Sequence, residues 1–142
     1  MQNKQLAIQV QESTICDPCS QSWQLYACTA EYPEYDMQKY LHSKLLQHLA
    51  VLGINPKLSG FHCILAACNL QLTDPNMLMK EIYPEVAKIN GLSDGSCAER
   101  NIRTAITNAW QKGNGYVWEC YFPQHTNCPT NKEFIKRLSQ LL

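Results

Sequence analysis

The sequence predicts an all-α fold of about six helices with an embedded helix-turn-helix, preceded by a short irregular N-terminal extension. Three observations lead to this fold class. Apolar residues recur at helical spacing over most of the chain from Met37 onward, turn-forming residues separate these segments, and a tight glycine-containing turn joins two of them. A chain of 142 residues, 45% hydrophobic and 17% charged, can bury one main core.

Residues 1–36 differ from the rest and are predicted to be an extension of unknown role, ahead of a domain at residues 37–142. They begin with a strand-like LAIQVQ, continue with a CDPC turn and then show no sustained period. They hold one lysine and five acidic residues, a net charge of −4, whereas the remainder holds eleven basic and seven acidic residues, a net charge of +4. A mildly basic domain behind an acidic extension suits a modest phosphate-binding face.

The first two helices are expected to supply much of the core. The first should begin after Asp36, acting as N-cap, and end at Gly53. Its expected buried stripe consists of Tyr40, Leu41, Leu45, Leu46, Leu49 and Leu52. The second should begin at about Gly60, with a stripe made of Phe61, Ile64, Leu65, Cys68 and Leu72.

Two further helical segments make the predicted helix-turn-helix, between about Lys80 and Lys112. The first of these segments should begin with Asp74 as its cap and Pro75 as its first helical residue. Pro84 should break or kink this helix near Tyr83, because proline has no N–H to donate and its ring crowds the preceding turn.

A tight turn, Asn-Gly-Leu-Ser at residues 90–93, separates that segment from the next helix. Asp94 or Ser93 should cap the next helix, and Gly113 should end it. A helix, a tight glycine-containing turn and a second helix follow one another in the order that a helix-turn-helix requires.

The last helix has the clearest local signal, because Thr130 precedes Glu133 by three residues, the spacing of a capping box. Its apolar face should consist of Phe134, Ile135, Leu138 and Leu141 or Leu142. Between Gly115 and Cys128, the aromatic stretch YVWECYF fits a short strand, a loop or another helical turn, and its periodicity does not decide among them.

The helix from Asp94 to Lys112 has two chemically different faces. Its apolar stripe, expected in the core, consists of Ala98, Ile102, Ala105, Ile106 and Ala109. Its polar face consists of Ser96, Glu99, Arg100, Arg103 and Thr107. Arginine can donate two parallel hydrogen bonds to guanine and glutamate can accept one from cytosine, so the candidate base contacts are Glu99, Arg100 and Arg103. Ser96 and Lys88 are candidate phosphate contacts, although a plain solvated helix face also fits this spacing.

Several separated motifs stand out: GFHCILAA, DPN with KEIYPEVAK, SCAERNIRTAITNAWQKGN and PTNKEFI. Together they resemble one family, the C-terminal effector domain of the stage-zero sporulation response regulator, and the resemblance runs from roughly Leu45 to Leu142. Their combination is far more specific than any single motif. The resemblance implies an all-helical fold containing a helix-turn-helix, and binding to short DNA boxes that control entry into sporulation.

The resemblance places DNA-contacting positions of the family at Ser96, Glu99, Arg100 and Arg103. Cys97 stands where the family usually has a further DNA-contacting arginine, and Cys128 stands where a lysine usually precedes PTN. These departures bear on affinity more than on fold. Only about 36 residues replace the receiver domain that the resembled regulator carries, and they contain no recognisable phosphoacceptor pocket. Control by aspartyl phosphorylation within this chain is therefore not expected.

The cysteines and histidines give no strong sign of a metal or catalytic site. Cys16 and Cys19 have the spacing of half a zinc site or of a redox pair, with Cys28 as a candidate third ligand, but no second CxxC or HxxxH follows. Cys63 and Cys68 should pack as small hydrophobes. No histidine has an acid or nucleophile at a diagnostic spacing, so we expect neither an enzyme nor a cofactor.

The leading hypothesis is a sequence-specific DNA-binding transcriptional regulator, expected in the cytoplasm because no signal peptide or membrane span is evident. Its expected partner is double-stranded DNA, and a homodimer on tandem sites and a protein partner bound through residues 1–36 are left open. One alternative is a protein-interaction module of the same fold that modulates a related regulator, which Cys97 and the zero net charge favour slightly. A more remote alternative is a small thiol redox or zinc protein that uses Cys16 and Cys19.

Overall fold

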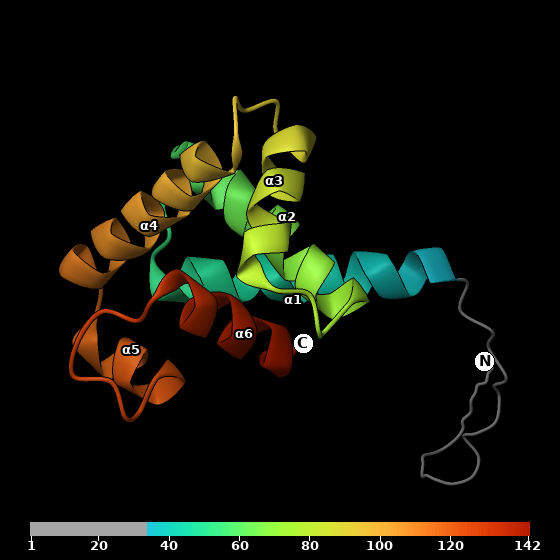
Figure 1. The fold of residues 1–142 in the computed structure, drawn as a ribbon. Coiled ribbons are helices and arrows are strands. Elements are labelled where there is room, and N and C mark those ends of the chain that lie inside the picture. Colours follow the sequence, from blue (N-terminus) through green and yellow to red (C-terminus); the bar gives the residue numbers. More distant parts are fainter. Residues whose placement is uncertain (1–33) are drawn as a thin grey trace, which may run out of the picture. The chain divides into compact units, whose positions relative to one another are not determined.

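A computed structural model describes residues 34–142 of the chain. The chain divides into two units between Lys39 and Tyr40, and the packing described below lies within the second unit, Tyr40–Leu142. The described residues form six helices and no strand, which confirms the predicted all-α fold (Figure 1). The strand-like start and the CDPC turn of the predicted extension lie outside the described residues.

The helices are α1 (Glu34–Leu52), α2 (Ser59–Thr73), α3 (Met79–Ile89), α4 (Gly95–Lys112), α5 (Gly115–Tyr121) and α6 (Asn131–Leu141). The second helix is central, because it packs against α3, α4 and α6. Figure 1 shows α3 and α4 joined by a short connection, and the two helices also pack against each other. The aromatic stretch whose structure the periodicity did not decide is the helix α5.

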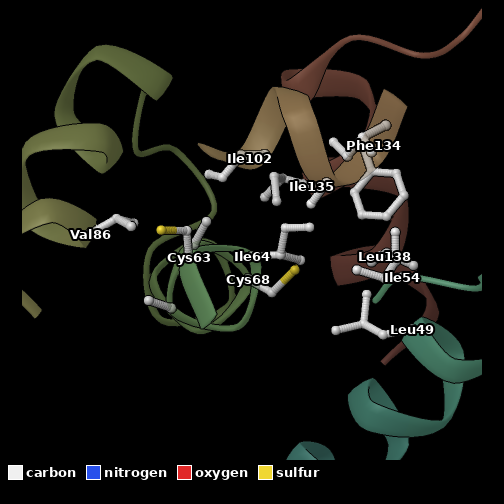
Figure 2. Close-up of a cluster of buried hydrophobic side chains, with 14 of the residues drawn as sticks. Leu49, Ile54, Cys63, Ile64, Cys68, Val86, Ile102, Phe134, Ile135 and Leu138 are labelled. Carbon is white, nitrogen blue, oxygen red and sulfur yellow. The ribbon is translucent and has the colours of Figure 1, made fainter. Parts of the chain in front are cut away.

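The hydrophobic core gathers around α2. Figure 2 shows Cys63, Ile64 and Cys68 of α2 in the middle of the cluster, with Val86 of α3 on one side and Leu138 of α6 on the other. Both cysteines are buried and unpaired, and burial raises the pKa of the Cys68 thiol to about 12. They pack as small hydrophobes, as predicted.

The first helix begins at Glu34, three residues before the predicted start at Met37, so Asp36 lies within its first turn and is not its N-cap. Leu45, Leu49 and Leu52 are buried as predicted, whereas Tyr40 is 58% exposed. At about 100° per residue, Tyr40 and Leu49 point to opposite sides of the helix, so including Tyr40 in the stripe was wrong.

The second helix buries more of its surface than one stripe. Ile64 and Cys68 are buried, but Phe61, Leu65 and Leu72 are only half-buried. Small residues extend the buried surface, and at Gly60 a Cβ atom would overlap the carbonyl oxygen of Asn101. Three helices therefore pack closely around α2, and a single apolar stripe underestimates its contacts.

The predicted start of the third helix was wrong. Residues 74–78 form a turn in which the Asp74 carboxylate accepts a hydrogen bond from the Asn76 N–H at 3.1 Å. The Gln71 amide donates to the Pro75 carbonyl at 2.9 Å, which holds this segment outside the helix. The helix begins at Met79 and is continuous through Pro84, so of the predicted break or kink the break does not occur. The N–H that Pro84 lacks would have bonded to the carbonyl of the exposed first turn, where water can reach it.

The last helix agrees with the prediction at both of its signals. The Thr130 hydroxyl accepts a hydrogen bond from the Glu133 N–H at 3.2 Å, and the Glu133 carboxylate accepts one from the Thr130 N–H at 2.9 Å. This is the predicted capping box. Phe134, Ile135 and Leu138 are buried, so this helix closes the core over α2.

Candidate nucleic-acid interface

The turn between α3 and α4 has the geometry of a helix-turn-helix. Gly91 adopts a φ of +68°, a conformation that residues with a Cβ atom rarely adopt. Asp94 is the N-cap of α4, since its carboxylate accepts a hydrogen bond from the Cys97 N–H at 2.9 Å. A Cβ atom on Gly95 would lie 3.2–3.3 Å from the backbone of Tyr83 and Pro84, so α4 starts in close contact with α3.

The two faces of α4 separate as the sequence predicts. The buried residues of this helix are Ala98, Ile102, Ala105, Ile106 and Ala109. On the opposite side Ser96, Glu99 and Arg100 are exposed, whereas Arg103 and Thr107 are half-buried. Packing of the apolar stripe against α2 and α3 therefore directs Glu99 and Arg100 outward.

Arg103 differs from Arg100 because its guanidinium is already bound within the fold. Its Nη2 donates to the Pro129 carbonyl at 2.8 Å and lies 3.2 Å from the Cys128 sulfur. Its Nε is buried and has no hydrogen-bond partner among the described residues. Part of the donor capacity of this predicted base contact is thus used by the loop before α6.

Asn131, at the start of α6, joins the two helices of the motif. Its Nδ2 donates to the Tyr83 hydroxyl of α3 at 3.2 Å and to the Glu99 carbonyl of α4 at 3.1 Å. The Asn131 side chain is buried, and burial also raises the pKa of Tyr83. This role of Asn131 was not predicted from the sequence, although Asn131 lies within the PTN motif.

A cavity of about 600 Å³ lies along the polar face of α4. Its lining combines the start of α3, the outer face of α4 and the start of α6: Met79, Tyr83, Ser96, Glu99, Arg100, Arg103, Thr130, Asn131 and Lys132. Four of the five residues on the predicted polar face of α4 line it. The structure therefore brings the predicted base contacts Glu99, Arg100 and Arg103 together with Ser96.

The remaining candidate phosphate contact, Lys88, lies in the last turn of α3 and is not part of that cavity. Its ammonium group is 3.6 Å from the Glu85 carboxylate, and the Lys88 side chain is 76% exposed. An exposed ion pair of this kind is weak, so Lys88 can exchange its partner at little cost.

The two cysteines at positions of departure have different surroundings. Cys97 is half-buried, and its sulfur accepts a long contact from the Asn101 amide at 3.9 Å. Cys128 is also half-buried and contacts Arg103. Cys97 therefore lies at the edge of the polar face, and Cys128 lies behind it.

A metal site is not evident in the described part of the chain. Residues 34–142 contain no group of three or more His, Cys, Asp or Glu side chains placed to hold a metal ion. The weak candidates Cys16 and Cys19 lie outside the described residues. None of the helices found between residues 34 and 142 has the length and apolar character needed to cross a membrane.

Comparison with known protein families gives an independent result. A family model described as "Sporulation initiation factor Spo0A C terminal" matches residues 45–142. The matched range begins within α1 and includes the whole helix-turn-helix, the cavity beside α4 and the last helix. It confirms the resemblance inferred from the separated motifs, over the same part of the chain.

Proposed function

The chain belongs to the family of the sporulation initiation factor Spo0A C-terminal domain, and we propose that it binds DNA sequence-specifically with α4 in the major groove. Membership makes residues 45–142 a DNA-binding effector domain of the sporulation-regulator type, which is a transcription-factor domain and not a known kind of enzyme. Such a domain acts where the DNA is, in the cytoplasm or on the nucleoid.

The observation that carries this proposal is the exposure of Glu99 and Arg100 in the first half of α4. In a helix-turn-helix this half of the second helix meets base edges. Arg100 would donate two hydrogen bonds to guanine O6 and N7, and Glu99 would accept one from cytosine N4. Arg103 would contribute the donors that Pro129 does not already use.

Two further residues are proposed to contact phosphates. Ser96 is exposed in the first turn of α4, where backbone N–H groups and the helix dipole favour an anion. Lys88 is exposed at the end of α3 and would replace its Glu85 partner with a phosphate oxygen. Contacts of this type fix the position of the protein on DNA but carry no sequence information.

Binding-site selection with the purified chain, followed by affinity measurements on the selected duplex and on a scrambled one, tests the proposal. Arg100→Ala should cost about 1–3 kcal/mol on the selected duplex and much less on the scrambled one. Lys88→Ala should weaken both alike, and Lys57→Ala, which changes an exposed lysine outside the motif, should weaken neither. Equal losses on both duplexes for Arg100→Ala would contradict the base contact. Absence of any DNA retention at low salt would contradict DNA binding and favour a protein-interaction module.

We further propose that residues 37–142 form the working domain and that residues 1–36 are dispensable for it. The family match and the core lie beyond residue 44. Removing residues 1–36 takes away a net charge of −4, so the shortened protein should unfold cooperatively and bind DNA at least as tightly as the full chain. Loss of cooperative unfolding would show that residues 1–36 belong to the core. Sedimentation of the full chain with a two-site duplex would test the homodimer on tandem sites.

A further inference from the structure

The segment Cys128–Asn131, which we call the brace, contacts the helix-turn-helix from the side that faces α6. Asn131 is 6% exposed, and both hydrogens of its amide have partners: the Tyr83 hydroxyl on α3 and the Glu99 carbonyl on α4. One buried side chain therefore connects both helices of the motif to a third helix.

The same segment also holds a side chain of the proposed DNA face. The carbonyl of Pro129 accepts a hydrogen bond from Arg103 at 2.8 Å, so one side of the guanidinium is bound to the brace. Thr130 anchors the brace through its capping box with Glu133. The α6 end of the brace, Asn131, therefore bonds to both α3 and α4, and its other end, Cys128 and Pro129, contacts Arg103 of α4.

We propose that Asn131 is a positioning residue that sets the sequence preference of α4 without touching DNA. The inference rests on the proposed function, because it assigns a role to a buried residue at the cavity beside the proposed DNA-binding face. A hydrogen bond to a base edge weakens steeply when its distance or angle changes, whereas the attraction between a cation and a phosphate tolerates small displacements. Loosening α4 should therefore reduce discrimination between sequences more than total affinity.

Asn131→Ala tests this role, with Gln71→Ala as the matched control. Gln71 is a second buried amide, 5% exposed, but its bonds go to the carbonyls of Asp74 and Pro75 in the turn before α3. The measurement is the ratio of affinities for the selected and the scrambled duplex, at a temperature where every variant is folded. Asn131→Ala should reduce this ratio roughly tenfold, and Gln71→Ala should leave it unchanged while lowering the melting temperature.

Tyr83→Phe provides a milder variant, since it removes only the hydroxyl that accepts from Asn131. It should reduce the same ratio by about threefold, and it should add nothing in the Asn131→Ala background, because the hydrogen bond is already absent there. If the reductions of the affinity ratio in Tyr83→Phe and Asn131→Ala add in the double variant, Tyr83 does not act through its hydrogen bond to Asn131.

Three outcomes separate this inference from the proposed function. A wild-type chain that prefers its selected duplex, with an Asn131→Ala variant that keeps the preference, would overturn the role of Asn131 alone. Equal reductions for Asn131→Ala and Gln71→Ala would also overturn it, because any buried amide would then have the same effect. A wild-type chain with no preference at all would instead contradict the proposed function.

Discussion

The two sides of α4 are built for different tasks. The side toward the core carries alanine and isoleucine side chains, and it approaches α2 so closely that Gly60 has no space for a Cβ atom beside Asn101. The outer side carries exposed charged and hydroxyl groups along an open cavity. One helix therefore combines a tightly packed surface, where shape determines stability, with a polar surface that has few partners of its own.

This difference means that folding and binding should respond to different substitutions. Changes on the inner side should alter the free energy of unfolding and leave the preference of the folded protein intact. Changes on the outer side should alter DNA binding and leave stability within about 0.5 kcal/mol, the usual range for surface positions.

The largest effect is expected from the inner side, for Ile102→Ala. Ile102 is fully buried, so the substitution should lower the free energy of unfolding by ~2–5 kcal/mol through lost apolar burial and a cavity. Denaturant unfolding measures this loss. The affinity ratio for selected and scrambled duplexes should stay at the wild-type value below the melting temperature. A changed ratio would show that the inner side of α4 also affects the preference for DNA sequence.

A smaller effect is expected at Asp94, where the two sides meet at the start of α4. Asp94→Ala removes the acceptor for the Cys97 N–H and should cost ~1 kcal/mol of stability. Asp94→Asn keeps an acceptor there and should cost much less. Both variants remove a negative charge close to the proposed phosphate contacts, so both should tighten DNA binding at low salt. Tighter binding by only one of them would show that charge is not the cause.

A change in the salt dependence of DNA binding is expected at Cys97, at the border of the polar face. Cys97→Arg should add a cation near a phosphate and make the dependence of log affinity on log salt steeper by up to about one unit. The long side chain can extend along the surface from a half-buried position, so folding should persist. A salt titration on the selected duplex measures the slope, with Cys97→Ala as the neutral control. An unchanged slope in the folded variant would mean that this end of α4 does not face DNA.

The smallest effect is expected far from α4, at the pair formed by His48 of α1 and Tyr121 of α5. Burial, with a smaller contribution from the charge of Lys44, lowers the pKa of His48 from its ordinary value of 6.5. The unfolded chain therefore binds this proton first, and stability present at neutral pH falls as the pH drops below 6.5. The fall should level off below the lowered pKa of the folded state.

His48→Gln should flatten this part of the stability profile between pH 7 and 5, as measured by denaturant unfolding at several pH values. The Gln side chain has both a donor and an acceptor for the Tyr121 hydroxyl, which lies 2.7 Å from the His48 Nδ1. Tyr121→Phe is the control, because it removes the hydroxyl but keeps the half-buried imidazole. A variant profile as steep as that of the wild type would assign the pH dependence to other groups.

The parts of the fold that the sequence predicted well depend on local chemistry. Gly91, Asp94 and the capping box at Thr130 each act within a few residues of their own position, so their types and spacing are enough. The inner stripe of α4 follows from helical periodicity in the same way.

The failures concern side-chain hydrogen bonds that helical periodicity and capping patterns do not describe. Asp74 and Pro75 form a good helix start, but the amide of Gln71 binds this segment as a turn, and no local pattern contains that bond. The role of Asn131 and the engagement of Arg103 by Pro129 both join residues more than twenty positions apart. The charged face of α4 could be predicted, whereas the support behind it could not.

The buried thiol of Cys68 allows opening of the core to be measured by alkylation. A thiol with a pKa of about 12 is almost entirely protonated at neutral pH, and alkylating reagents attack the thiolate. Cys120 is exposed and should be labelled quickly, whereas Cys68 should be labelled only when α2 and α6 separate. The delay between the two labelling events would report the free energy of that opening in the unmodified chain. The labelling rate of Cys68 relative to Cys120 therefore measures local unfolding without an added probe.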